Sequence, residues 1–259
     1  MKPLLRWLSL MALALALLQL FFVARIAAML VINPQSTAFE RSEAWRVATE
    51  KGTLRWRQQW TPYPLISDSL KRAVIASEDD GFVNHDGVDW NALEKAWQKN
   101  AKAQEQVAKA KAKAKNPAKP DAKTAASPAP TKPDKQAKVV GGSTITQQLA
   151  KNLFLSGERT LLRKGQEFML TLLLEAILDK ERILEIYLNS VEWGEGVFGA
   201  EAAAQHYYRK PAAQLSAYEA ARLAVILPRP KYFEKLPNSN YVAGRAEVIV
   251  GRLANAELP

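Results

Sequence analysis

The sequence of 259 residues contains no cysteine and only two histidines, His85 and His206. The lack of cysteine excludes a disulfide scaffold, a thiolate metal site and a cysteine nucleophile. Two histidines are too few for a metal site built from several imidazole groups. No internal repeat and no series of alternating strands is visible. Apolar residues make up 48% of the chain, which is enough for a substantial core and excludes a wholly disordered protein.

Positive charge is concentrated in one segment. Residues 99–138 contain eleven lysines and three acidic residues, so they carry most of the formal net charge of +10. This segment has no leucine, isoleucine or aromatic residue, and its second half is rich in proline, which prevents a continuous helix. We predict a mobile insertion, with a solvated helix over 101–115, whose lysines touch anionic lipid headgroups. Nucleic-acid binding is not expected, because no aromatic residues are interleaved with the lysines.

An apolar run begins at Trp7, reaches Ala24 and resumes over 26–32. A membrane-spanning helix needs about 20 such residues, and Lys2 and Arg6 place the N-terminus in the cytoplasm by the positive-inside rule. The alternative is a cleaved signal peptide, whose apolar region is usually about 7–15 residues long. We predict an uncleaved anchor over 1–34, followed by a catalytic domain over 35–259 outside the cytoplasmic membrane.

The remainder of the sequence has helical periodicity, so the predicted fold class is mainly α. Residues 34–60 are interpreted as a connector with one strand, and Gly194, Gly196 and Gly199 as a loop. Helices are expected after Ser67, after Thr144, over 163–178, over 180–189, after the glycine-rich loop, after Ser216 and over 241–253.

Five carboxylates and His85 fall within residues 78–89, at the end of the helix that follows Ser67. Acidic residues at a helix C-terminus oppose the helix dipole, so the placement of Glu78 and Asp79 costs stability unless it serves a function. Desolvation there would raise the pKa of a carboxyl group, as a general base or acid requires. The alternative is an ordinary capped helix end, and His85 taken alone is interpreted as structural.

Two further segments are compatible with anion binding. Gly141 and Gly142 precede a helix whose free N–H groups can face an anion, although a capped helix explains the same pattern. Arg163 and Glu167 are four residues apart, which is typical of a surface ion pair. A functional interpretation adds Lys164 as a phosphate partner and Glu167 as a second catalytic carboxylate.

Taken together, the segments resemble the peptidoglycan glycosyltransferases, glycosyltransferase family 51. The family's motifs E-D-x-x-F-x-x-H-x-G, G-x-S-T-x-x-Q-Q, R-K-x-x-E and I-L-x-x-Y-x-N correspond here to residues 78–87, 141–148, 163–167 and 183–189. The resemblance implies a lysozyme-like helical domain that polymerises lipid II by inverting displacement of undecaprenyl diphosphate. It implies catalysis by Glu78 and Glu167, and substrate binding by Asp79, Phe82, His85, Thr144, Gln148, Lys151, Arg163, Lys164 and Asn189.

The same resemblance implies a divalent cation, Mg²⁺ or Mn²⁺, bound with the substrate diphosphate. Expected partners are lipid II, the growing glycan strand, lipids of the cytoplasmic membrane and other cell-wall synthesis proteins. No Ser-x-x-Lys or Lys-Thr-Gly transpeptidase signature occurs, which indicates polymerisation without cross-linking. The alternatives are a lysozyme-like lytic muramidase and a membrane-tethered basic binding protein.

Overall fold

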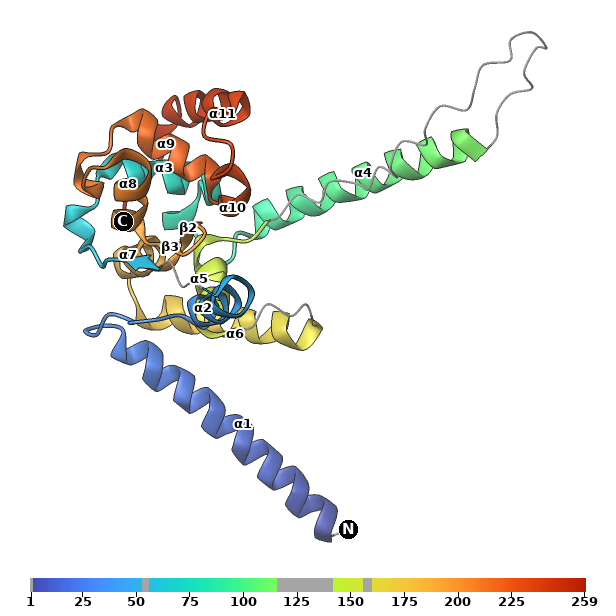
Figure 1. Ribbon diagram of the computed structural model, residues 1–259. Helices are drawn as coiled ribbons and strands as arrows, with labels where there is room; N and C mark the ends of the chain where they lie inside the picture. Colours follow the sequence, from blue (N-terminus) through green and yellow to red (C-terminus); the bar gives the residue numbers. More distant parts are fainter. Residues whose placement is uncertain (1, 53–55, 116–141, 156–159) are drawn as a thin grey trace. The chain divides into compact units, whose positions relative to one another are not determined.

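The computed structural model describes residues 2–52, 56–115, 142–155 and 160–259 (Figure 1). Its contacts divide the chain into a unit formed by residues 1–88 with 144–259 and a unit formed by residues 89–143. Helices dominate both units, so the predicted mainly α class is confirmed.

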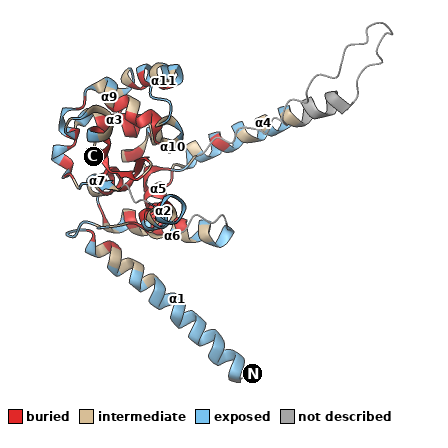
Figure 2. Ribbon diagram, in the orientation of Figure 1, coloured by how far each residue is buried: buried red, intermediate tan, exposed pale blue. Residues whose placement is uncertain are grey.

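Helix α1 (Lys2–Ala28) is long and apolar enough to cross a membrane, and it is the one such helix among the described residues. Most of its side chains are exposed in the structure (Figure 2), as expected of a helix whose partners are lipids. The predicted N-terminal transmembrane helix is therefore confirmed by length and composition.

The core of the first unit is a group of packed helices. α3 (Asp68–Glu78) packs on α9 (Ala217–Ile226), and α11 (Asn240–Val250) packs on both. α5 (Ile145–Phe154) packs on α6 (Leu161–Ile177) and α7 (Lys180–Ser190). The predicted caps at Ser67, Thr144 and Ser216 are all present and fix where α3, α5 and α9 begin. The remaining helices of this unit are α8 (Ala200–Tyr208), α10 (Pro230–Phe233) and the short 3₁₀ turns Tyr63–Leu65, Phe82–Asn84, Ala212–Gln214 and Leu253–Asn255.

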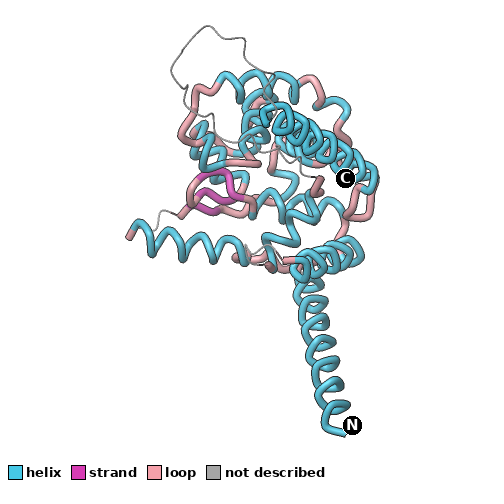
Figure 3. Tube along the Cα trace, turned by 90° about the vertical axis from the view of Figure 1, so that its right-hand side faces the viewer, coloured by secondary structure: helices cyan, strands magenta, loops and turns pink. Residues whose placement is uncertain are grey.

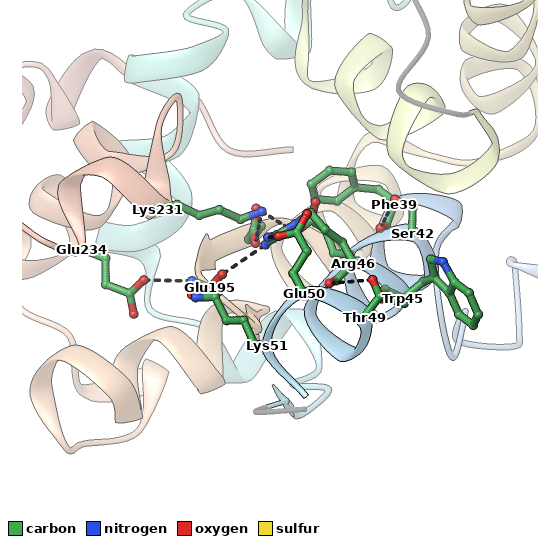
Figure 4. A network of polar contacts seen from close by, with 12 residues as sticks. Phe39, Ser42, Trp45, Arg46, Thr49, Glu50, Lys51, Glu195, Lys231 and Glu234 are labelled. Carbon is green, nitrogen blue, oxygen red and sulfur yellow. Dashed lines mark hydrogen bonds and ion pairs between the residues drawn. The ribbon is translucent and has the colours of Figure 1, made fainter. Parts of the chain in front are cut away.

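Helix α2 (Ala38–Lys51) lies where a connector was predicted. A capping box between Thr37 and Glu40 starts the helix, and charged side chains tether its exposed face to the rest of the unit (Figure 4). Arg46 forms ion pairs with Glu43, Glu50 and Glu195. The prediction was wrong because α2 has only a weak apolar periodicity, although it buries Val47 and packs on α5.

A three-stranded sheet lies beside these helices, in the order β1 (Arg57–Gln58), β3 (Val197–Phe198), β2 (Glu192–Gly194) (Figure 3). The single strand predicted before residue 60 is confirmed, whereas the predicted glycine-rich loop is a hairpin. Gly199 has φ +84° and begins α8, and a Cβ there would approach the Asn189 carbonyl oxygen to 2.8 Å. That close approach of two backbone segments requires glycine.

In the second unit, helix α4 (Trp90–Lys115) contains the helix predicted over 101–115 and begins eleven residues earlier. The rest of the predicted insertion, 116–138, lies outside the described residues. Its mobility and its contact with lipid headgroups therefore stay predictions.

Candidate active site

Glu78 is the last residue of α3, and its side chain is half-buried. Gln148 of α5 donates a hydrogen bond from Nε2 to Glu78 Oε2 over 2.9 Å. Desolvation raises the pKa of Glu78, and the neighbouring charge of Asp79 raises it further. The Gln148 hydrogen bond and the Lys151 ammonium oppose that rise. The structure thus brings Glu78, Gln148 and Lys151 together.

Tyr187 fixes the orientation of the Gln148 amide. Its hydroxyl donates to Gln148 Oε1 over 3.0 Å, which leaves the amide NH₂ directed at Glu78. Tyr187 is fully buried, and desolvation raises the pKa of its phenol well above the usual range, so the hydroxyl stays a donor. The sequence analysis missed this role, although Tyr187 is the tyrosine of the fourth motif.

Asp79 connects the first two motifs. Its Oδ1 lies 2.9 Å from His85 Nε2, and its Oδ2 accepts a 2.9 Å hydrogen bond from the backbone N–H of Ile145. The side chain is buried, and both carboxylate oxygens have protein partners. Asp79 and His85 therefore position the end of α3 against the start of α5. Their expected contacts with substrate stay predictions.

Thr144 is also occupied by the protein. Its hydroxyl donates to the Gly87 carbonyl oxygen over 2.6 Å and accepts from the backbone N–H of Gln147. Gly87 has φ +82°, and a Cβ there would lie 2.7 Å from Thr171 Cγ2. Thr144 is 3% exposed and caps α5, so it has a structural role, and its expected contact with substrate stays a prediction.

Phe82 is fully buried, and its expected role in substrate binding stays a prediction. The Lys180 ammonium lies 4.7 Å from the centre of its ring, donates to the His85 carbonyl oxygen over 2.6 Å and pairs with Glu175. This lysine, which the sequence analysis missed, holds the segment after Glu78 against α7.

The third motif gathers positive charge on α6. Arg163 Nη1 lies 2.9 Å from Glu167 Oε2, and Lys164 pairs with the other oxygen of the same carboxylate. Glu167 is buried, whereas the Lys164 side chain is half exposed. Glu167 therefore holds two cations in place. Its expected catalytic role stays a prediction.

Lys151 connects the cations to Glu78. Desolvation lowers the pKa of its ammonium group although the residue reaches the surface, and the charges of Arg163 and Lys164 lower it further. The carboxylates of Glu167 and Glu78 act in the opposite direction. Lys151 of the second motif thus interacts electrostatically with the charged residues of the third motif and with Glu78, the candidate base.

Asn189 joins the end of α7 to the segment before α3. It is fully buried, its Oδ1 accepts from the Thr61 backbone N–H, and its Nδ2 donates to the carbonyl oxygens of Thr61 and Glu185. The two bonds to Thr61 join α7 to the segment before α3, and the bond to Glu185 lies within α7. The expected contact of Asn189 with substrate stays a prediction.

Among the described residues, no three histidine, aspartate or glutamate side chains gather as a protein-built metal site. Mg²⁺ is commonly held by one or two carboxylates together with substrate phosphates and water. The residues present therefore fit a cation that arrives with a diphosphate better than a cation held by protein ligands alone.

Comparison with known proteins decides the family. The model of the family described as Transglycosylase matches residues 46–110 and 121–254, well over half of the chain. The chain belongs to the transglycosylase family. Both segments of the match lie in the predicted catalytic domain, and the gap between them falls within the predicted insertion. The predicted resemblance to this family is confirmed, and with it the prediction of a glycosyltransferase enzyme.

Curated relatives in the transglycosylase family carry the name biosynthetic peptidoglycan transglycosylase. One from Burkholderia thailandensis is 52% identical over 241 residues, which cover 93% of this chain and 82% of the relative. One from Herminiimonas arsenicoxydans is 47% identical over 260 residues, covering 100% and 99% of the two chains. One from Burkholderia orbicola is 49% identical over 93% of this chain and 85% of the relative.

Proposed function

We propose that the chain polymerises lipid II into the glycan strands of peptidoglycan, with Glu78 as general base. The observation that carries the proposal is a half-buried carboxylate with a raised pKa, which is hydrogen-bonded by Gln148 and interacts electrostatically with Lys151. Membership of the transglycosylase family and the names of the curated relatives support the substrate class.

Glu78 accepts the proton of the acceptor sugar hydroxyl while that oxygen attacks the anomeric carbon of the lipid-linked chain. The new glycosidic bond forms on one face as the bond to the diphosphate breaks on the other, so the configuration inverts. A positioned base of this kind contributes about 10²–10⁴-fold to the rate. A raised pKa strengthens the base but requires a pH at which the carboxyl group is ionised.

Negative charge develops on the diphosphate as it leaves. This negative charge is stabilised by three cationic side chains, those of Lys151, Arg163 and Lys164. Glu167 forms ion pairs with Arg163 and Lys164 and so holds them on α6. Fixed charges of this kind act without rearranging during the reaction. We assign these three cations to the leaving group and Glu78 to the acceptor.

We keep Mg²⁺ or Mn²⁺ as an accompanying cation, which would neutralise diphosphate oxygens when bound. Removal of divalent cations with a chelator, followed by readdition of each metal, tests this expectation. Lost activity that returns with the metal supports it, and activity unaffected by chelation contradicts it.

The membrane arrangement follows from α1. The lipid carrier stays in the bilayer, so the active site must work at its surface, and the anchor provides that attachment. Lys2 and Arg6 precede the span, which favours a cytoplasmic N-terminus and a catalytic domain on the periplasmic side of the inner membrane. Other cell-wall synthesis proteins remain expected partners.

Purified full-length protein incubated with labelled lipid II tests the proposal. We expect long glycan strands, no peptide cross-links and release of undecaprenyl diphosphate. A lytic muramidase would instead release soluble fragments from finished cell wall and leave lipid II unused. That result would overturn the proposal.

A further inference from the structure

A cavity of about 310 Å³ opens just beyond the last turn of α1. Its walls are formed by the end of the membrane helix and the segment that follows it, including Arg25, Ala28, Ile32, Pro34, Ser36 and Arg41. This cavity has no part in the active site described above, because none of the motif residues line it.

Two guanidinium groups face an otherwise largely apolar wall. Among the described residues, no ion pair involves Arg25 or Arg41. Arg25 lies 5.2 Å above the Phe154 ring, and Arg41 uses only Nη1, which donates to the backbone and hydroxyl oxygens of Ser36. The remaining N–H donors of both side chains are thus available to an anion.

The nearby acidic group does not compensate this charge. Arg41 interacts electrostatically with Glu40, but Glu40 is buried, accepts hydrogen bonds from Thr37 N–H and Gln58, and does not line the cavity. Burial raises the pKa of Glu40 to about 7, so it carries a partial charge at neutral pH. An excess of positive charge therefore remains at the cavity.

The cavity is held in shape by a third arginine. Arg182 of α7 donates from Nε to the Met29 carbonyl oxygen over 2.8 Å and from Nη2 to Asn33 Oδ1 over 2.7 Å. Unlike Arg25 and Arg41, Arg182 is neutralised by an ion pair, with Glu185 at 3.0 Å. These two hydrogen bonds fix the segment after the membrane helix to α7. The cavity is therefore present before any ligand binds.

We propose that this cavity binds the phosphate group of a membrane glycerophospholipid. The phosphate lies between Arg25 and Arg41, because guanidinium groups form strong charge-assisted hydrogen bonds with phosphate oxygens. The glycerol and first acyl carbons pack on Ala28, Ile32 and Pro34. A lipid phosphate is the favoured source because the candidate span ends at Ala28, at the level where headgroups meet water. The proposal depends on α1 spanning a membrane and not on the reaction catalysed.

Binding of short-chain phosphatidylglycerol to the full-length protein in uncharged detergent tests this site. Arg25→Gln combined with Arg41→Gln should weaken binding about 25-fold, because each arginine near an anionic lipid contributes about fivefold. The matched control is Arg245→Gln combined with Arg252→Gln, which removes the same charge from exposed positions away from the cavity. We expect the control to bind within about twofold of the native protein.

A second variant separates the cavity from net charge. Ala28→Trp fills the space between the end of α1 and the following segment without removing a charge, and it should also weaken binding. Unchanged thermal unfolding of each variant shows that the fold is kept. Equal loss in the two double variants, or full binding by Ala28→Trp, would overturn the proposal. So would competition by inorganic phosphate at the concentration at which the lipid binds, because that result would indicate a free-phosphate site.

Discussion

Replacement of Asp79 by asparagine is a sharp test of how the active site is assembled. The substitution keeps the size and shape of the side chain and removes its negative charge. In the native protein one carboxylate oxygen faces His85 Nε2 and the other accepts from the Ile145 N–H, both over 2.9 Å. Asparagine has only one acceptor oxygen, so it keeps both contacts only if His85 adopts the tautomer whose Nε2 accepts from the amide, which places the ring proton on the buried and unpartnered Nδ1.

The cost follows from the burial of Asp79, which is 7% exposed. A hydrogen bond to a charged group contributes about 1.5–3 kcal/mol to the free energy of unfolding, and the unpartnered donor has no access to water. For a protein of this size each kcal/mol lowers Tm by about 2–4 °C. We therefore expect Asp79→Asn to lower Tm by about 3–12 °C and to reduce kcat, because Glu78 precedes Asp79 directly.

Asp80→Asn is the matched control. Asp80 is exposed and adjacent, and no hydrogen bond or ion pair of this residue occurs among the described residues. Its substitution should change the free energy of unfolding by no more than about 0.5 kcal/mol. Thermal unfolding of both variants in the same detergent, with polymerisation rates measured in parallel, makes the comparison. Equal Tm values for the two variants would refute the argument that Asp79 joins α3 to α5.

Three further predictions follow from the charges and hydrogen bonds. Activity should fall as pH drops through the raised pKa of Glu78. Because Lys151 lowers that pKa, Lys151→Met should move the loss of activity to higher pH. An unchanged pH profile of kcat/KM in the variant would contradict this prediction. Asn189→Ala should lower the free energy of unfolding by about 2–4 kcal/mol, because three hydrogen bonds are lost. The KM for lipid II should stay unchanged, whereas a raised KM in a stable variant would indicate a substrate contact. Burial raises the pKa of Glu192 to about 7, so its ionisation destabilises the folded state by up to about 3 kcal/mol as pH rises from 5 to 8. Glu192→Gln should remove this pH dependence of stability. Parallel profiles of Tm against pH for the native protein and the variant would contradict the prediction.

The sequence predicts most of the helices because capping residues and apolar periodicity act locally. Ser67, Thr144 and Ser216 begin helices where their sequence patterns indicate. Helix α2 has a local signal in the Thr37–Glu40 capping box, but its apolar periodicity is weak, and contacts such as the ion pair of Arg46 with Glu195 join residues 149 apart in sequence. No local pattern reports contacts of that kind.

The same limit applies to the active site. Motifs identify Glu78 and Gln148 as neighbours in function, and the structure joins them directly. The motifs do not distinguish a residue that faces substrate from one that supports it, so Thr144, Phe82 and Asn189 were all assigned to substrate. Their burial and hydrogen-bond partners depend on tertiary contacts, which no motif reports, and their contact with substrate stays a prediction.

The most direct test of the mechanism compares Glu78→Gln with the native protein in a single-turnover assay on labelled lipid II, alongside a binding measurement with the same substrate. Glutamine keeps the size of the side chain and cannot accept the proton. We predict a rate of glycosidic bond formation reduced by about 10²–10⁴-fold, with substrate binding retained. A native rate in Glu78→Gln would contradict the assignment of Glu78 as the base.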